Sequence, residues 1–160
     1  MKFNLFLLLL ATLIAAVSAG LPPFSLVRIQ SEINTDLFWE AKDGKIALTK
    51  SGSLWQVTET NGNYQISPDD NHNLAVQYNG VNSDFTLNSI SPGNPDQRFQ
   101  FEPEPALNKG LAIRSVQDPN SYASTSPSSC TGTSNCHDTY ISAKTGDNRK
   151  QWVLRGFENF

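Results

Sequence analysis

Three short stretches, each centred on one aromatic ring, place the strongest constraint on how this chain of 160 residues can fold. The rings belong to Trp55, Phe99 and Trp152, and each is followed two positions later by an apolar residue. A polar turn precedes each ring, and this combination is typical of a short, half-buried strand entered from a tight loop. The three rings are 44 and 53 residues apart in the sequence. Recurrence of the same strand pattern at such intervals predicts three copies of one supersecondary unit.

The residues between the rings repeat in the same order. Each unit opens on a strand with an isoleucine, namely Ile29, Ile66 and Ile113. Short alternating runs follow, separated by turn signals such as Asp43-Gly44, and no segment sustains an apolar period of about 3.6 residues. The sequence therefore predicts an all-β domain of three four-strand units, over approximately 24–60, 61–107 and 108–156. The alternative is an ordinary β-sandwich in which the likeness of the three stretches is accidental.

The N-terminus has the pattern of an export signal. Lys2 supplies a basic start, residues 5–17 are almost entirely apolar, and Val17-Ser18-Ala19 provides the small residues that a signal peptidase requires. The apolar run is too short for a membrane span, and no later segment is long and apolar enough to be one. We expect cleavage after Ala19, a secreted extracellular protein, and one domain over residues 20–160.

The mature chain is expected to be mildly acidic, because removal of Lys2 leaves 11 Lys+Arg against 15 Asp+Glu, a net charge of about −4. There is no basic stripe, so nucleic acid and anionic membranes are not expected as partners. Cys130 and Cys136 enclose five residues. In an oxidising compartment we expect them to form a local disulfide, worth about 2 kcal/mol for so short a loop.

The ring-centred strands resemble the Gln-x-Trp motif that closes each repeat of the ricin-B-type β-trefoil lectins. The second repeat keeps the motif as Gln97-Arg98-Phe99, with Phe in place of Trp. The first and third repeats keep the Trp but carry Ser53 and Lys150 where the family has Gln. The resemblance covers Phe24 to about Gly156 and implies a β-trefoil with pseudo-threefold symmetry.

The resemblance also implies where a sugar would bind. A sugar-binding repeat of that family has an acidic residue after its first strand, an aromatic platform about a dozen residues before the Trp, and an amide just ahead of the motif. Carboxylates and amides bond vicinal hydroxyls, and a ring covers the apolar C–H face of a sugar. The third repeat fits best, with Asp118, Tyr140 and Asn148, the last one position further from the Trp than in the family pattern. The second repeat offers Asp70 or its neighbour Asp69, then Phe85 and Asp96. In the first repeat Asp36 is available, but Asp43 occupies the platform position, so no site is expected there.

Each of these assignments has a structural alternative. The rings of Trp55, Phe99 and Trp152 are expected to be core, since the fourth-strand ring is structural even in the family. Tyr140 has the alternative of a half-buried strand residue, and Asp118 that of a residue that only caps its turn.

The sequence contains no recognisable catalytic or metal-binding motif. The two histidines, His72 and His137, have neither metal-ligand nor nucleophile spacing around them, and no glycine-rich phosphate loop is present. Residues 69–73 carry oxygen-bearing side chains at alternate positions as a calcium loop does, but they lack its central Gly and closing Glu. We therefore expect no enzyme, no cofactor and no metal.

The sequence thus predicts a secreted, non-catalytic carbohydrate-binding protein whose partners are glycans or glycoproteins. A second hypothesis is a secreted trefoil that binds a protease or another extracellular protein through the loop at 124–138, which contains both cysteines. A third is an effector-like protein that has kept the fold and lost sugar binding.

Overall fold

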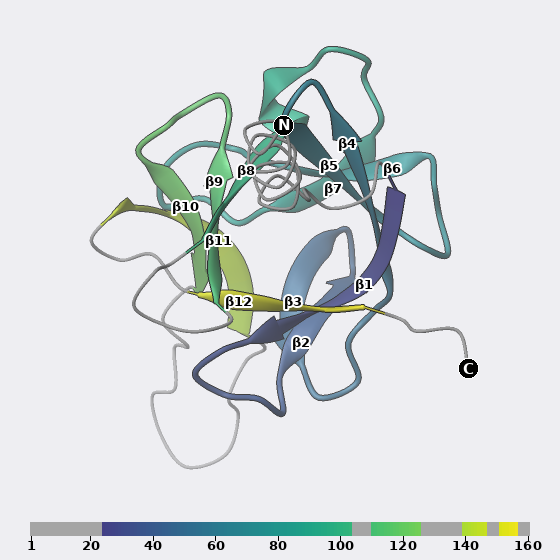
Figure 1. The fold of residues 1–160 in the computed structure, drawn as a ribbon, viewed down its shortest axis with the longest axis vertical. Helices are drawn as coiled ribbons and strands as arrows, with labels where there is room; N and C mark the ends of the chain where they lie inside the picture. The colour runs from purple at the N-terminus through teal and green to yellow at the C-terminus, as the bar shows by residue number, and fades with distance from the viewer. Residues whose placement is uncertain (1–23, 104–109, 126–138, 147–150, 157–160) are drawn as a thin grey trace, which may run out of the picture.

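The computed structural model describes residues 24–103, 110–125, 139–146 and 151–156, and these form an antiparallel β fold with one short 3₁₀ turn (Figure 1). The elements are β1 (Phe24–Ser31), β2 (Phe38–Lys42), β3 (Lys45–Thr49), β4 (Trp55–Thr60), β5 (Asn63–Pro68), β6 (Leu74–Gln77), β7 (Thr86–Ser89), η1 (Pro95–Gln97), β8 (Phe99–Pro103), β9 (Leu111–Ser115), β10 (Ser121–Thr125), β11 (Thr139–Thr145) and β12 (Trp152–Gly156). The predicted all-β class is therefore confirmed.

Six of these strands close into a barrel. Going round it, β1 pairs with β4, β4 with β5, β5 with β8, β8 with β9, β9 with β12, and β12 with β1 again. Each repeat therefore contributes its first and fourth strands to the barrel. Closure pairs these strands on both sides and so leaves no exposed sheet edge.

The registers of the barrel repeat three times. The isoleucine of each first strand lies opposite the residue two positions beyond the aromatic ring of the preceding repeat, in the pairs Ile66↔Val57, Ile113↔Phe101 and Ile29↔Leu154. The residue two before each isoleucine lies opposite the ring of its own repeat, in the pairs Val27↔Trp55, Tyr64↔Phe99 and Leu111↔Trp152. A two-sheet sandwich has no such threefold register, so the fold is a β-trefoil.

The second and third strands of each repeat form a hairpin, and the three hairpins meet around the pseudo-threefold axis. Equivalent cross-strand pairs, Trp39↔Leu48, Val76↔Leu87 and Ala123↔Ala143, align the hairpins with one another. The residues three positions before the second member of each pair are Lys45, Asp84 and Tyr140. Each of these three residues pairs with a residue of the next repeat. The partner lies two positions after the equivalent residue of that repeat, which gives the pairs Lys45↔Thr86, Asp84↔Ser142 and Tyr140↔Ala47. The three pairings form a closed ring, which places these three backbone positions around the axis.

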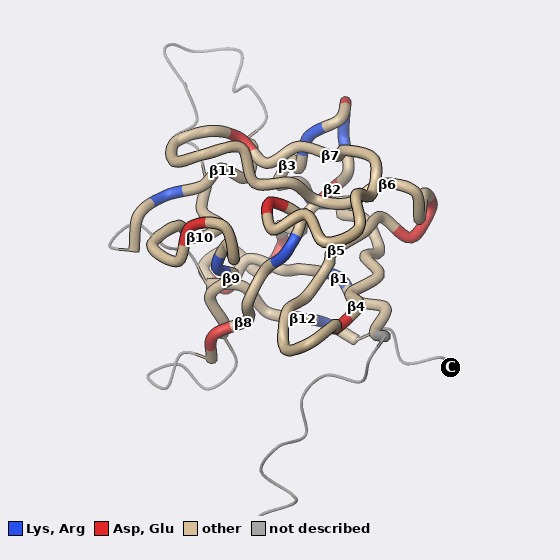
Figure 2. Tube along the Cα trace, turned by 90° about the horizontal axis from the view of Figure 1, so that it is seen from above, with Lys and Arg blue, Asp and Glu red and all other residues tan. Residues whose placement is uncertain are grey.

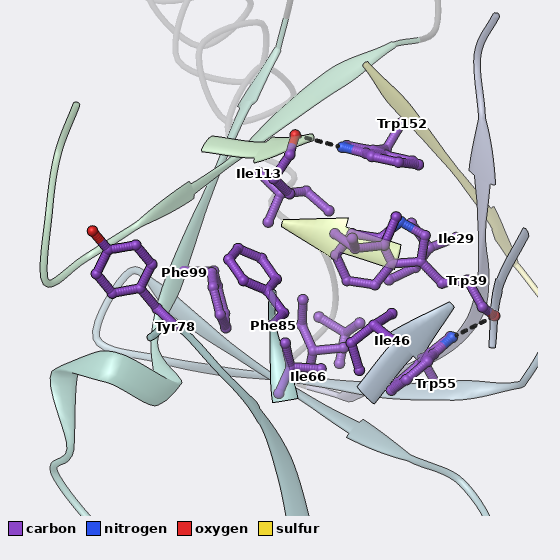
Figure 3. Packing of buried hydrophobic residues seen from close by; sticks show 14 of the residues in the cluster. Ile29, Trp39, Ile46, Trp55, Ile66, Tyr78, Phe85, Phe99, Ile113 and Trp152 are labelled. Carbon is purple, nitrogen blue, oxygen red and sulfur yellow. Dashed lines mark hydrogen bonds between the residues drawn. The ribbon is translucent and has the colours of Figure 1, made fainter. Parts of the chain in front are cut away.

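The core is filled by aromatic and branched side chains on the inner faces of barrel and hairpins. The three fourth-strand rings are fully buried, as the sequence predicts, with Trp55 and Phe99 0% and Trp152 1% exposed. Trp39 lies among them, and its ring centroid is 6.2 Å from that of Trp55 and 5.3 Å from that of Trp152, in edge-to-face contacts (Figure 3). The equivalents of Trp39 are Val76 and Ala123, so one large ring of the first repeat fills space that smaller side chains leave in the other two.

Two of the fourth-strand rings are held by the same polar contact. The indole N–H of Trp55 donates to the carbonyl of Trp39, and that of Trp152 donates to the carbonyl of Ala123, both at 3.2 Å (Figure 3). The two acceptors occupy equivalent positions in β2 and β10. A buried N–H needs a partner, so these bonds fix the orientation of the two indoles.

Along the described backbone, the positions of Lys and Arg are interspersed with those of Asp and Glu (Figure 2). Within the ranges given above, no helix has the length and apolar character needed to span a membrane.

Candidate functional site

The turn after the first strand has the same hydrogen bonds in all three repeats. Its central residues are Asn34, Asn71 and Asp118. The side-chain Oδ1 of each accepts a bond from the backbone N–H two residues later, at 3.3, 3.2 and 3.1 Å respectively. The carbonyl of each accepts from the N–H three residues later, at 3.0, 3.2 and 2.9 Å. These are Asx turns, a conformation that Asn and Asp favour.

This alignment shows which residue of each repeat corresponds to the predicted acidic position. In the second repeat it is Asn71, and Asp70 lies one residue earlier on an exposed part of the turn. In the first repeat it is Asn34 and not Asp36, whose backbone N–H is the donor to Asn34. The sequence prediction looked for an acid, whereas the turn requires only an oxygen acceptor. Among the three equivalent positions, only Asp118 carries a carboxylate.

The second carboxylate oxygen of Asp118 bonds two hydroxyls. Its Oδ2 accepts from Oγ of Ser121 at 2.7 Å and from the phenol of Tyr78 at 3.1 Å. Tyr78 belongs to the second repeat; its ring packs in the core, and its hydroxyl points out of the cluster (Figure 3). The Ser121 hydroxyl, then the Asn120 N–H and then the Tyr78 hydroxyl favour the ionised form and lower the pKa of Asp118. The carboxylate is thus held anionic in one orientation, on the seam between two repeats.

Burial raises the pKa of Tyr78, whereas the pKa of Asp118 is lowered. The ring is 7% exposed. Desolvation is the largest cause of the raised pKa of Tyr78, with the hydrogen bond and charge of Asp118 adding to it and the Ser121 hydroxyl opposing it. Tyr78 therefore stays a neutral donor over the physiological range and keeps its bond to Asp118.

Tyr140 lies at the other end of the hairpin from Asp118. In the β10–β11 pairing Thr145 faces Ser121, and Asp118 sits just before Ser121, near the end of β11. Tyr140 is near the start of β11, five residues before Thr145, which corresponds to about 16 Å along a strand. The structure therefore does not bring these two predicted site residues together. Counting back from Trp152 located Tyr140 in the right strand but not at the end of it that meets the turn.

Tyr140 instead contacts Lys45 of the first repeat, which in turn pairs with Asp84 of the second. Nζ of Lys45 lies 4.9 Å from the centroid of the Tyr140 ring, a cation–π distance, and forms an ion pair of 2.9 Å with Oδ2 of Asp84. The Lys45 and Asp84 side chains are 43% and 26% exposed, and Tyr140 is half-buried. The hydrogen bond and charge of Asp84 raise the pKa of Lys45. We call Lys45, Asp84 and Tyr140 the axial cluster.

The predicted platform of the second repeat is wrong. Phe85 is 1% exposed, and its ring packs against those of Trp39, Tyr78 and Phe99, so it presents no face to a ligand. It points inward because it is the strand neighbour of Asp84, and successive side chains point to opposite faces. Asp96 lies in η1, where its carbonyl accepts a bond of 2.8 Å from the N–H of Tyr78. The predicted sugar site of the second repeat is thus left without its aromatic member.

The family-like glutamine of the second repeat has a structural role that the sequence did not assign. Gln97 is 1% exposed. Its Nε2 donates to the carbonyl of Ser89 at 2.9 Å and to Oε1 of Gln77 at 3.2 Å, while its Oε1 accepts from the N–H of Ser91 at 2.9 Å. One buried amide thus ties the end of β7 to the end of η1.

Several predicted features lie outside the described residues. These are the signal peptide at 1–19, Asn148, and the cysteines Cys130 and Cys136. Most of the loop at 124–138, on which the protein-binding hypothesis depends, lies there too. Over the part of the chain that is described, no group of three or more His, Cys, Asp or Glu side chains could hold a metal ion.

Comparison with known proteins supports the fold at low sequence identity. No protein-family model and no curated protein matches the sequence. Among solved structures, a mosquitocidal holotoxin is similar over 84% of this chain and 17% of its own, with a TM-score of 0.65 and 15% identity. The BEL β-trefoil is similar over 83% of this chain and 93% of its own, with a TM-score of 0.64 and 14% identity.

A third similar structure belongs to an enzyme. It is a GlcNAcα1-4Gal-releasing endo-β-galactosidase from Clostridium perfringens, with a TM-score of 0.64 and 10% identity over 84% of this chain and 33% of its own. The chain thus spans only a part of the holotoxin and of the galactosidase, and nearly all of the BEL β-trefoil. At such identities the likeness establishes the β-trefoil fold alone.

Proposed function

We propose that the protein is a secreted, non-catalytic carbohydrate-binding β-trefoil in which Asp118 anchors the sugar. The observation that carries the proposal is the carboxylate at the turn of the third repeat, where the other two repeats have amides. Its orientation is set by Ser121, Tyr78 and Asn120 before any ligand arrives. A preoriented anionic acceptor loses little entropy when it bonds sugar hydroxyls.

The hydrogen-bond count of Asp118 leaves room for a ligand. An ionised carboxylate has about four acceptor positions, and the three bonds described above occupy three of them. The residue is half-exposed, so a sugar hydroxyl can reach the remaining position. A site of one or a few such bonds gives a Kd near millimolar, about 4 kcal/mol, and useful affinity arises through multivalency. The similarity to an endo-β-galactosidase, which acts on a saccharide, is consistent with this ligand class.

A glycan array tests the proposal with a matched pair of variants. Tyr78→Phe removes the hydroxyl that donates to Asp118 and keeps the carboxylate, whereas Asp118→Asn removes the carboxylate and keeps the size of the side chain. We expect binding by the wild type and by Tyr78→Phe, and loss of binding by Asp118→Asn. Absence of wild-type binding on a broad array, or equal binding by Asp118→Asn, would refute it.

Secretion is tested separately. Expression of the full chain in a eukaryotic secretion host should release a protein into the medium whose N-terminal sequence begins at Gly20. Retention of the protein inside the cell, or an unprocessed Met1 start in the medium, would contradict the predicted signal peptide.

A further inference from the structure

The axial cluster combines three kinds of side chain at one symmetric position. The three repeats place a cation, an anion and an aromatic ring at the equivalent residues Lys45, Asp84 and Tyr140. We propose that this cluster is a second sugar site, which binds a neutral pyranose through vicinal hydroxyls and shares no residue with the Asp118 site. The ligand class, a sugar, rests on the proposed function, whereas the choice of residues rests on their place around the pseudo-threefold axis.

The backbone holds the cluster in place. The three pairings Lys45↔Thr86, Asp84↔Ser142 and Tyr140↔Ala47 fix its members around the axis. Directly beneath them, the next residue of each repeat is buried, Ile46 and Ile141 at 0% and Phe85 at 1% exposure. A surface group that stands on a close-packed floor and on paired backbone is preorganised for binding.

The charges of the cluster select an uncharged ligand. Lys45 and Asp84 have opposite formal charges and lie 2.9 Å apart, so they exert little net attraction on an ion. A cationic ligand would have to displace the Lys45 ammonium from the Tyr140 ring, and an anionic one would meet the Asp84 carboxylate. A hydroxyl group, by contrast, can accept from the ammonium or donate to the carboxylate, and a vicinal diol can do both.

The ring supplies the remaining element of a sugar site. Sugars present an apolar C–H face as well as hydroxyls, and the part of the half-buried Tyr140 ring that Lys45 leaves uncovered can pack against that face. Lys45 has three N–H donors, and within the described part of the chain Asp84 takes one of them, so donors remain there for a hydroxyl. Lys45 thus contacts both the acceptor Asp84 and the ring of Tyr140, and the three side chains come from three different repeats.

The two sites would act together on an oligosaccharide. Asp118 and Tyr140 mark opposite ends of the β10–β11 hairpin, about 16 Å apart along the strand. A ligand that spans both sites binds the second one intramolecularly, at an effective concentration well above that of the free sugar. The domain should therefore bind extended glycans more tightly than monosaccharides.

An NMR titration tests the axial site directly. The isotopically labelled purified protein is titrated with galactose, glucose, mannose and N-acetylglucosamine, and the backbone amides of Lys45, Asp84 and Tyr140 are followed. We expect at least one sugar to shift these amides with saturation, and the affinity to be unchanged between low and high salt, as befits a neutral ligand. Tyr140→Ala should weaken this binding about tenfold or more, whereas Tyr140→Phe, which keeps the ring, should stay within about twofold of the wild type.

Two further variants keep the test decisive. Lys45→Met retains the length of the side chain without its N–H donors, and should also weaken binding about tenfold, which tests the site even if Tyr140→Ala does not fold. Asp118→Asn should leave the axial shifts intact, so that failure of the Asp118 site and failure of the axial site are separate results. The inference is overturned if none of the four sugars shifts the axial amides, if Tyr140→Ala or Lys45→Met binds as the wild type does, or if added salt weakens the binding.

Discussion

The buried N–H of Trp39 allows a quantitative test of the core. The Trp39 side chain is 0% exposed, and its Nε1 has no hydrogen-bond partner among the described residues, whereas Nε1 of Trp152 donates to the carbonyl of Ala123 at 3.2 Å. A buried donor without a partner costs about 1–3 kcal/mol. The substitution Trp39→Phe removes that unpaired donor together with part of the ring, whereas Trp152→Phe removes an N–H that is hydrogen-bonded to Ala123.

The magnitudes follow from these contacts. Truncation of a core Trp to Ala costs about 3–5 kcal/mol, and we take the change to Phe as about 2 kcal/mol at either position. Relief of the unpaired N–H, about 1–3 kcal/mol, offsets this loss in Trp39→Phe, so the net change in the free energy of unfolding lies within about 1 kcal/mol of zero. Trp152→Phe deprives a buried carbonyl of a donor, which raises its cost to about 3 kcal/mol.

Equilibrium unfolding in urea, followed by far-UV circular dichroism, measures both variants against the wild type. Circular dichroism is preferred because each substitution removes a fluorophore. The expected result is a midpoint for Trp39→Phe close to that of the wild type and a clearly lower midpoint for Trp152→Phe, with similar slopes. If Trp39→Phe is as destabilising as Trp152→Phe, the unpaired donor does not carry the assigned cost.

Three other expectations follow from the structure. The pKa of Asp118 is lowered, first by the Ser121 hydroxyl. The contribution of this carboxylate to stability is therefore present above the unfolded pKa of about 3.9 and is lost as the pH falls through the folded pKa. The difference in Tm between wild type and Asp118→Asn should accordingly shrink below about pH 4. Gln97→Ala leaves buried backbone groups unpaired and should cost about 2–4 kcal/mol, with faster amide exchange over 89–97; a cost below about 1 kcal/mol would contradict this role. Gly52 has a φ of +63°, and an added Cβ would lie 2.5 Å from Cβ of Phe38. Gly52→Ala should therefore lower the Tm by several degrees in a thermal melt, and an unchanged Tm would contradict this expectation.

The candidate sites show where prediction from the sequence was sound and where it was not. Asp118 was correctly placed in the turn after the first strand of the third repeat, because Asp-Pro-Asn is a local turn signal. Phe85 was wrongly expected at the surface, because the sequence does not say which face of a strand points inward until the pairing is known. The sequence predicts Tyr140 beside Asp118, but the structure places it against Lys45, which pairs with Asp84, 39 residues further along the chain.

The fold class and the threefold repeat could be predicted from the sequence because they follow from local patterns of residues. Alternation at period two, turn residues between strands and a ring at the end of each unit are properties of short segments, and these survive without any knowledge of the packing. The meeting of Lys45, Asp84 and Tyr140 was decided only in three dimensions. Their contact depends on the register with which three distant hairpins close around one axis, and no local pattern of residues encodes that register.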